Sequence, residues 1–443
     1  MRHYIFFIML LCTLIPTNGR SQSIEQILPS ADPISTLICN CDQQRITIMY
    51  ELDANRIGWL YYINPGNTAL QKVQLPNGVE LKDMECIGDT MYFGGANTAT
   101  KQGLVGFFNV QDLFFNSGQI HFCEILPLWG IQGCHLPMIK KIDCYEYGTG
   151  IHIAFIGKMQ LTEDTIGTIG EAIYDNIANT WDVSYFYNKE QRINYTDVTT
   201  TQNYVVAVGT DPEHQYIMQG WRQTSGFLYD PLFSGQISVA NDNVNESKLF
   251  VTHIQNNEFA VTYEYSENNG IGIKINTHKV NTTNGFMFTA GMKVAPWTGH
   301  TNVIYDVAYQ GQANNPCIMV VHRVYSSIYN SYFVSWFDYF NIWPNYHRAK
   351  HLNDKVTSID FLRDWGYQLS GSIYSNPCWT LYRYDNLSVQ NTCFPHESPT
   401  NAQNSVNITN IPLSIIIEIP HISTYTITPT VNSDSSYINC QTN

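Results

Sequence analysis

Charged residues are scarce in this 443-residue chain, where they make up 14% of the composition against a usual value of about a quarter. Basic residues are the scarcer sign, with 23 Lys and Arg against 37 Asp and Glu, which gives a net charge of −14. That balance argues against nucleic acid and anionic membrane surfaces as partners, because both repel an acidic protein. A disordered chain is excluded as well, because 44% of the residues are hydrophobic and 13% are aromatic.

Long apolar runs are also lacking, apart from residues 5–15, which follow a short basic start at Arg2 and His3. That run is too short for a helix that spans a bilayer. Its length, and the polar and small residues after Pro16, are typical of a signal peptide. The sequence therefore predicts a signal peptide over residues 1–21 and a mature protein without a transmembrane segment. It would be exported to the periplasm, the cell surface or the extracellular space.

Several common site motifs are missing from the sequence. No CxxC pair, no Cys/His spacing of a zinc site, no Gly-x-Ser-x-Gly elbow and no phosphate-binding loop occurs. His347 and His351 have the spacing of a metal-binding helix face but lack the Glu of the zinc-protease motif. We therefore expect no cofactor. Ten of the 11 cysteines lie outside the signal peptide, and an even number in an exported chain predicts disulfides of undetermined pairing.

What the sequence does contain is an aspartate that returns at a nearly constant interval. Asp143, Asp197, Asp306 and Asp360 are separated by 54, 109 and 54 residues, and 109 is about two periods. Thr252 occupies the skipped position, and Glu85 lies about one period before Asp143. A fixed period of this size indicates one supersecondary unit that is repeated side by side.

The repeat can be followed through seven units. They begin near Ile34, Met84, Ile142, Thr196, Phe250, Tyr305 and Ile359. Each holds short β-branched and aromatic runs between Gly, Asn, Asp and Pro residues, which is the pattern of strands. We predict an all-β fold, a single β-propeller of seven blades over residues 34–394. Residues 395–443 begin rich in Ser, Thr and Asn, and we predict that they form closing or accessory strands.

Two segments resemble motifs of kelch-type propellers. Residues 87–95 contain Met91-Tyr-Phe-Gly-Gly95, which resembles the double-glycine strand of that family. Residues 172–181, with Tyr174-Asp and Asn179-Thr-Trp181, resemble its Tyr-Asp and Trp segment. The resemblance covers two partial motifs and implies a propeller fold. The export signal and the composition resemble exported proteins of Bacteroidota.

The acidic series is the first candidate site. The opening strand of each propeller blade lines the central channel, so these side chains are expected to converge at one level: Glu85, Asp143, Asp197, Asp306 and Asp360. They could form a polar ligand pocket or a cation site, for which Ca²⁺ suits carboxylate oxygens. Alternatively, each Asp accepts backbone N–H bonds that hold the loop entering its own blade. The regular repetition favours this structural role.

Four tryptophans in Gly- or Pro-containing loops are the second candidate: Trp129, Trp297, Trp343 and Trp365. Exposed rings beside Asn, Asp and Tyr suit sugar binding, whereas rings wedged between blades serve packing alone. Two functions follow from the sequence. The first, which it favours, is a non-enzymatic binding or scaffold propeller that presents one face to a glycan, peptide or protein. The alternative is a glycoside hydrolase or lyase that acts on extracellular polysaccharide with channel-mouth carboxylates.

Overall fold

The computed structural model describes residues 24–29, 33–41, 46–64, 69–126, 135–147, 150–160, 165–187, 192–212, 216–222, 231–238, 244–267, 270–281, 285–294, 299–310, 317–327, 330–338, 346–351, 355–362, 366–373, 376–383, 396–397, 407–411, 416–418, 420–435 and 437–441. The predicted signal peptide lies outside this part of the chain. The all-β class predicted from the sequence is confirmed. Strands dominate the described residues, and the helix α2 (Val110–Phe115) is a short connection between two of them.

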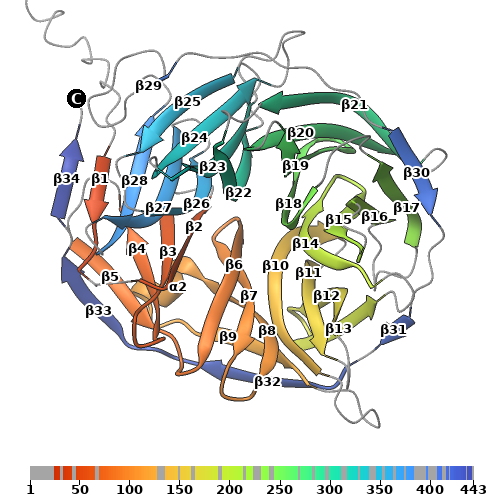
Figure 1. Ribbon diagram of the computed structural model, residues 1–443. Coiled ribbons are helices and arrows are strands. Elements are labelled where there is room, and N and C mark those ends of the chain that lie inside the picture. Colours follow the sequence, from red (N-terminus) through yellow and green to blue (C-terminus); the bar gives the residue numbers. More distant parts are fainter. Residues whose placement is uncertain are drawn as a thin grey trace, which may run out of the picture.

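The strands form antiparallel sheets, called blades here, that are arranged in a ring (Figure 1). Blade 1 holds β2 (Ser35–Cys41), β3 (Ile46–Leu52), β4 (Gly58–Ile63) and β5 (Ala69–Gln74); blade 2 holds β6 (Val79–Ile87), β7 (Thr90–Asn97), β8 (Gln102–Asn109) and β9 (Ile120–Ile125). Blade 3 holds β10 (His135–Tyr147), β11 (Gly150–Gln160), β12 (Thr165–Asp175) and β13 (Thr180–Tyr187); blade 4 holds β14 (Asn194–Thr200), β15 (Tyr204–Thr210), β16 (Tyr216–Arg222) and β17 (Pro231–Ser238).

The second half of the ring repeats the same unit. Blade 5 holds β18 (Val244–Gln255), β19 (Glu258–Glu267), β20 (Gly270–Asn281) and β21 (Gly285–Val294); blade 6 holds β22 (Thr301–Gln310), β23 (Cys317–Tyr325), β24 (Asn330–Asp338) and β25 (Tyr346–His351). Blade 7 holds β26 (Lys355–Leu362), β27 (Gly366–Ile373) and β28 (Asn376–Arg383), followed by β1 (Ile24–Ile27) from the other end of the chain. One parallel residue pair, Ile271 with Thr301, joins blades 5 and 6 into a continuous sheet.

The first strand of each blade lies innermost and contacts the first strands of the two neighbouring blades. This chain of contacts runs β2, β6, β10, β14, β18, β22 and β26, and β26 contacts β2 again. The inner strands therefore close a complete circle. The described residues form the seven-bladed ring that the repeat predicts.

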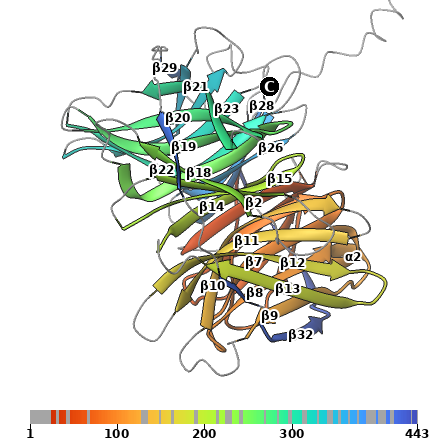
Figure 2. The ribbon, with the colours of Figure 1, turned by 90° about the vertical axis from the view of Figure 1, so that its right-hand side faces the viewer.

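An outer belt, defined by the described strands between residues 396 and 441, runs around the outside of this ring. Its strands are β29 (His396–Glu397), β30 (Asn407–Ile411), β31 (Ile416–Glu418), β32 (Ile422–Ile427), β33 (Val431–Ser435) and β34 (Tyr437–Gln441). They add an antiparallel outer strand to blades 6, 4, 3, 2, 1 and 7, in that order. The belt thus runs against the order of the blades, and Figure 2 shows β32 at the outer edge of the molecule beside β9.

Both ends of the described chain meet in blade 7. β1 pairs with β28 on one side and with β34, the last belt strand, on the other. Gln26 and Ile27 in β1 are fully buried there. The ring therefore begins at Ile24, ahead of the boundary at residue 34 that the repeat indicates, because a four-residue strand carries no periodic signal of its own.

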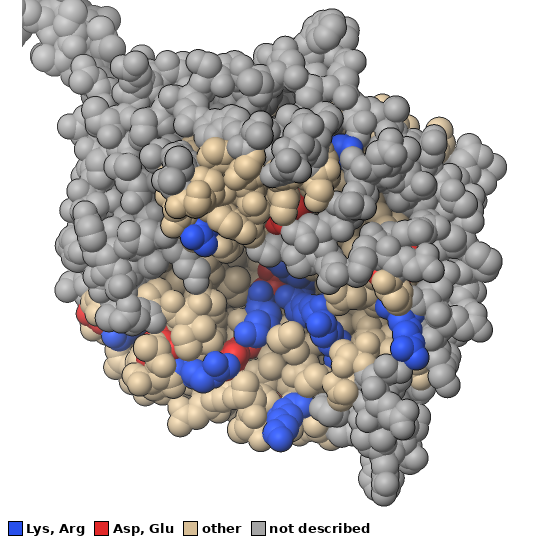
Figure 3. Space-filling model, in the orientation of Figure 1, with Lys and Arg blue, Asp and Glu red and all other residues tan. Residues whose placement is uncertain are grey.

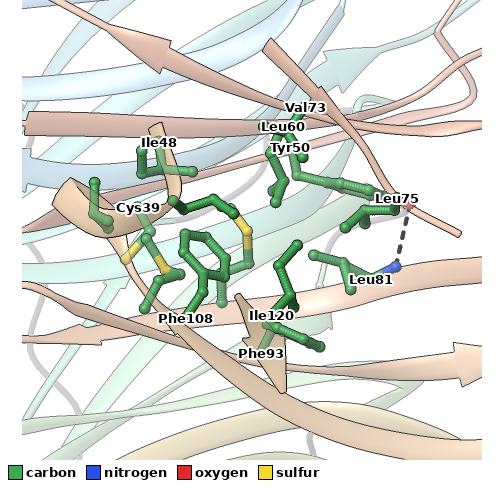
Figure 4. Close-up of a cluster of buried hydrophobic side chains, with 14 of the residues drawn as sticks. Cys39, Ile48, Tyr50, Leu60, Val73, Leu75, Leu81, Phe93, Phe108 and Ile120 are labelled. Carbon is green, nitrogen blue, oxygen red and sulfur yellow. Dashed lines mark hydrogen bonds between the residues drawn. The ribbon is translucent and has the colours of Figure 1, made fainter. Parts of the chain in front are cut away.

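The hydrophobic core lies between successive blades, as the cluster in Figure 4 illustrates. Tyr50 of blade 1 packs there with Phe93 and Phe108 of blade 2, and its hydroxyl accepts the Leu81 N–H at 3.2 Å. All seven residues of β3 are buried, because a blade packs against a neighbour on each face. Full burial of one large apolar side chain stabilises the fold by roughly 1.5–3 kcal/mol, so packing between successive blades contributes strongly to stability.

The two glycines of β7 are explained by how closely blades pack. A Cβ atom on Gly95 would lie 2.0 Å from the Glu80 carbonyl oxygen, and one on Gly94 would lie 2.5 Å from Ile142 of blade 3. Neither position has room for a side chain. No helix among the described residues has the length and apolarity needed to cross a membrane.

Candidate functional site: the axial cavity

A cavity of about 330 Å³ lies on the axis of the ring and is called the axial cavity here. Residues from the inner strands of all seven blades line it, from Cys39 on β2 to Asp360 on β26. In the view of Figure 3 the molecule is hollowed at its centre, with acidic atoms visible inside. All five carboxylates of the predicted series line the cavity: Glu85, Asp143, Asp197, Asp306 and Asp360.

Two further charged residues line the cavity that the repeat analysis missed. Asp83 lies two residues before Glu85 on β6, and Lys141 lies two residues before Asp143 on β10. Residues two apart on a strand point to the same side. This alternation is the signal in the sequence that could have identified both.

The carboxylates occupy two levels of the channel, so the expectation of a single level was wrong. Six of the seven inner strands contain a register shift of the β-bulge type. In five of them the residue directly after such a shift defines the first level: Asp83, Lys141, Asp197, Asp306 and Ser358. The second level lies two residues further along each strand, at about 6.8 Å, and includes Glu85, Asp143, Thr199 and Asp360. The series of evenly spaced aspartates therefore contains residues from both levels: Asp197 and Asp306 from the first, and Asp143 and Asp360 from the second.

First-level carboxylates reach across to the next blade. Asp83 accepts the Ile142 N–H at 2.9 Å and Asp197 accepts the Val251 N–H at 2.9 Å. Asp306 accepts the Ile359 N–H at 3.0 Å and the Ser358 hydroxyl at 2.9 Å. Each of these bonds ties one inner strand to its successor, at the junctions from blade 2 to 3, 4 to 5 and 6 to 7.

Second-level carboxylates form the same bond at two other junctions. Asp143 accepts the Thr200 N–H at 2.5 Å and both threonine hydroxyls, of Thr199 and Thr200. Asp360 accepts the Asn40 N–H at 2.6 Å, which ties blade 7 to blade 1. The predicted bonds within one blade also form, since the other oxygen of Asp143 accepts the Cys144 N–H at 2.7 Å. The aspartates therefore hold each blade to the next as well as shaping their own strand.

The two remaining junctions are held by other means. The disulfide Cys41–Cys86 joins β2 of blade 1 to β6 of blade 2. Between blades 5 and 6, Glu264 of β19 accepts the Ile304 N–H at 2.7 Å. Cys86 thus has a disulfide partner, whereas Cys144, its counterpart one repeat later, is a free and buried thiol.

Lys141 places one ammonium group among the first-level carboxylates. Its Nζ lies 3.0 Å from Asp83 Oδ1 and 3.9 Å from Asp306 Oδ1. Burial by itself would lower the pKa of this lysine, but Asp83, Asp306 and Asp197 outweigh burial and raise it. Lys141 is therefore charged and compensates part of the negative charge at this level.

Burial in the cavity destabilises the ionised form of these carboxylates, because it removes water from around them. Burial raises the pKa of Asp197 to about 8, although the Lys141 ammonium and the Val251 N–H lower it. The pKa of Glu85 is raised well above its usual value by burial and then by Asp143, Asp360 and Asp83. At neutral pH part of this carboxylate set therefore carries protons. His253, which also lines the cavity, has its pKa lowered by burial and is neutral.

Within the described ranges, no group of three or more His, Cys, Asp or Glu side chains is arranged to hold a metal ion. The Ca²⁺ alternative stays a prediction from the sequence. His347 and His351 lie in the strand β25, so the helix face that their spacing suggested does not form. His152 and His322 are buried and hydrogen-bonded, to Glu171 and to Asn302 and Ser335, as expected of core residues.

The four tryptophan candidates, Trp129, Trp297, Trp343 and Trp365, lie outside the described residues. Trp181 is described, and it packs between blades: its ring centroid lies 5.7 Å from that of Phe107 in blade 2. Cys123 is a buried free thiol, and Cys134 lies outside the described ranges. Comparison with protein-family models and with the sequences of curated proteins finds no match.

Proposed function

We propose that this chain is an exported binding protein without enzymatic activity, which presents one mouth of its channel to a peptide, protein or glycan partner. The acidic lining of the axial cavity carries the proposal, because six Asp and Glu side chains face the one ammonium of Lys141 among the described lining residues, and the raised pKa values of Glu85 and Asp197 reflect this excess of acidic groups. A cationic group of the partner, such as a lysine side chain or an amino sugar, would relieve this excess. The export signal and the disulfide support a location outside the cytoplasm.

The hydrogen bonds of the acids favour binding over catalysis. A catalytic acid or base must exchange its proton with a substrate in reach. Asp83, Asp143, Asp197, Asp306 and Asp360 instead accept backbone N–H groups that hold successive blades together. Such fixed carboxylates attract a cation without having to move.

A second candidate function is a hydrolase or lyase that acts on extracellular polysaccharide, and the environment of Glu85 favours it. The raised pKa of this carboxyl beside Asp143 and Asp360 is the property of a general acid. On this alternative, Glu85→Gln abolishes product formation from polysaccharide. On the binding proposal, no product forms with either protein.

The experiment uses two probes that differ in one charge, Nα-acetyl-lysine amide and Nα-acetyl-norleucine amide, titrated into the mature protein in a calorimeter. We expect the lysine probe to bind and the norleucine probe to bind at least tenfold more weakly. Glu85→Gln should bind the lysine probe measurably more weakly than the parent protein does. Glu146→Gln, an exposed acid on the same strand as Asp143, is the matched control and should change nothing. Equal affinity for the two probes would refute the cavity as a cation site.

A further inference from the structure

A group of basic side chains lies on one face of the ring, around the mouth from which the inner strands start. We call it the basic arc, and it comprises Arg56, Lys82, Lys101, Lys140, Lys158 and Arg192. Figure 3 shows Lys and Arg atoms around the central hollow on the side of β6 and β10. The arc extends from blade 1 through blades 2 and 3 to the entry of blade 4. It is a local exception in a chain with a net charge of −14.

Contacts within the arc place its first half on this face. Arg56, in the turn before β4, forms an ion pair with Glu80 at the start of β6. Lys82 Nζ lies 3.2 Å from the other oxygen of Glu80. Lys101 belongs to the turn after β7, where the Thr98 N–H donates to the Gly78 carbonyl just ahead of β6.

The second half of the arc is held by neutral oxygens. Lys140 Nζ donates to Asn194 Oδ1 and to the Tyr195 carbonyl, each at 3.1 Å, and these residues lie two and three positions after Arg192. Lys158 pairs with Met138 near the start of β10, so it lies close to Lys140. Burial, and then the charge of Lys158, lower the pKa of Lys140 to about 7. The ammonium groups of Lys140 and Lys158 therefore repel each other.

The balance of charge across the arc favours an anion. Glu80, whose side chain is 3% exposed, forms ion pairs with both Arg56 and Lys82. Asp53, in the turn of Arg56, is a second carboxylate, and its oxygens accept N–H groups of its own turn and of Trp59. The six basic groups of the arc outnumber these two acids. The Arg56 side chain is 59% exposed and that of Lys82 is 32% exposed, so both can reach a bound group. An anion beside Lys140 and Lys158 would offset their mutual repulsion and hold Lys140 in its charged form.

We infer that the basic arc binds an acidic polysaccharide, a chain of sugars that carries carboxylates at intervals. The arc crosses three blades, which suits an extended polymer better than a compact anion. A densely charged polyphosphate is disfavoured, because the rest of this acidic protein repels it. A polymer with widely spaced carboxylates is attracted by the arc and is repelled less strongly by the acidic remainder of the protein. The inference deepens the proposed binding function and rests on it, but it concerns the rim of the mouth, whereas the cation site concerns the cavity.

The test measures binding of polygalacturonate to the mature protein by affinity electrophoresis and calorimetry at several salt concentrations. Fully methyl-esterified polygalacturonate, which has the same backbone without the charge, is the matched ligand. We expect the charged polymer to bind at low salt, the ester to bind at least tenfold more weakly, and affinity to fall as salt rises.

Variants locate the site. Lys101→Gln with Lys158→Gln removes two charges that form no ion pair with another described residue, and should lower affinity at least fivefold while melting is unchanged. Lys279→Gln, an exposed lysine on blade 5, is the control and should bind as the parent does. Equal binding of the ester, no effect of the double change, or equal affinity for duplex DNA would each overturn the inference. Glu85→Gln should leave polygalacturonate binding intact, so failure of the cavity proposal is distinguishable from failure of this one.

Discussion

A single carboxylate can hold structure and store a proton at the same position. Asp197 ties blade 4 to blade 5 through the Val251 N–H, yet burial raises its pKa to about 8. An ordinary aspartate in an unfolded chain loses its proton near pH 4. Between these two values the folded protein binds a proton that the unfolded chain does not, so the folded state is stabilised at the acidic end of that window.

The expected consequence is a contribution of Asp197 to stability that falls as pH rises from about 5 to 8.5. The raised pKa values of Glu85, Asp83 and Asp143 act in the same direction, whereas the lowered pKa values of His253, His278 and Lys140 act in the opposite direction. Comparison of the parent with Asp197→Asn isolates the carboxylate: the melting temperature of the variant relative to the parent should rise as pH rises over this range. Differential scanning fluorimetry measures this difference. A difference that does not change with pH would contradict the assignment.

At the scale of one element, the inner strand shows what sequence reasoning can and cannot recover. The aspartate period predicted the number of blades because five of the seven junctions repeat one contact, an aspartate that accepts a backbone N–H of the next inner strand. The two levels could not be predicted, because a β-bulge inserts a residue, such as Lys140 or Thr196, without a mark in the sequence. The alternation along β10 could have placed Lys141 in the channel, but its ion pairs with Asp83 and Asp306 could not be predicted, because these partners lie on strands far away in the chain.

The belt strands were beyond sequence reasoning for a different reason. They are two to six residues long, and each pairs with a blade built hundreds of residues earlier or, in blade 6, with a near neighbour. In β32 the exposed positions carry Ser and Thr, and Ile422, Tyr425 and Ile427 are half-buried. The Tyr425 ring stacks on Phe122 of β9, at 4.9 Å between centroids, a contact between residues about 300 positions apart that the sequence pattern does not reveal.

A deletion of residues 437–443 tests the last belt strand. It removes β34 and leaves β1 paired with β28 alone. We expect amide hydrogen exchange in Glu25 and Gln26 to accelerate at least tenfold, because one edge of β1 becomes open to water. Exchange in β11 of blade 3, the internal control, should stay as in the parent. Unchanged exchange in β1 would mean that β34 contributes nothing to closure.

The whole molecule is a ring in which each of the seven junctions has its own fastening. Six are hydrogen-bonded by carboxylates, and the junction from blade 1 to blade 2 is covalent. The ring is closed, so every blade is held by two junctions. Loss of the disulfide at one junction should therefore lower the free energy of unfolding of the whole ring, and not of blades 1 and 2 alone.

Cys41→Ser with Cys86→Ser removes the bridge, which spans 45 residues of sequence. The chain-entropy relation gives a loss of about 4 kcal/mol in the free energy of unfolding for a loop of this size. Urea denaturation measures it, and the same loss should follow when dithiothreitol reduces the parent. Cys144→Ser, which removes a free thiol of the neighbouring inner strand, should cost clearly less. Equal losses for the two variants would show that packing, not the bridge, is responsible.

The position of the belt strands at the end of the sequence has a consequence for synthesis of the protein. Residues 396–441 leave the ribosome after every blade has been made, yet they cover the outer strands of six blades. A chain that stops early therefore displays open strand edges around most of its circumference, where proteases and aggregation begin. Chains that carry the belt strands conceal those edges, so the last strands to be synthesised protect strands made much earlier.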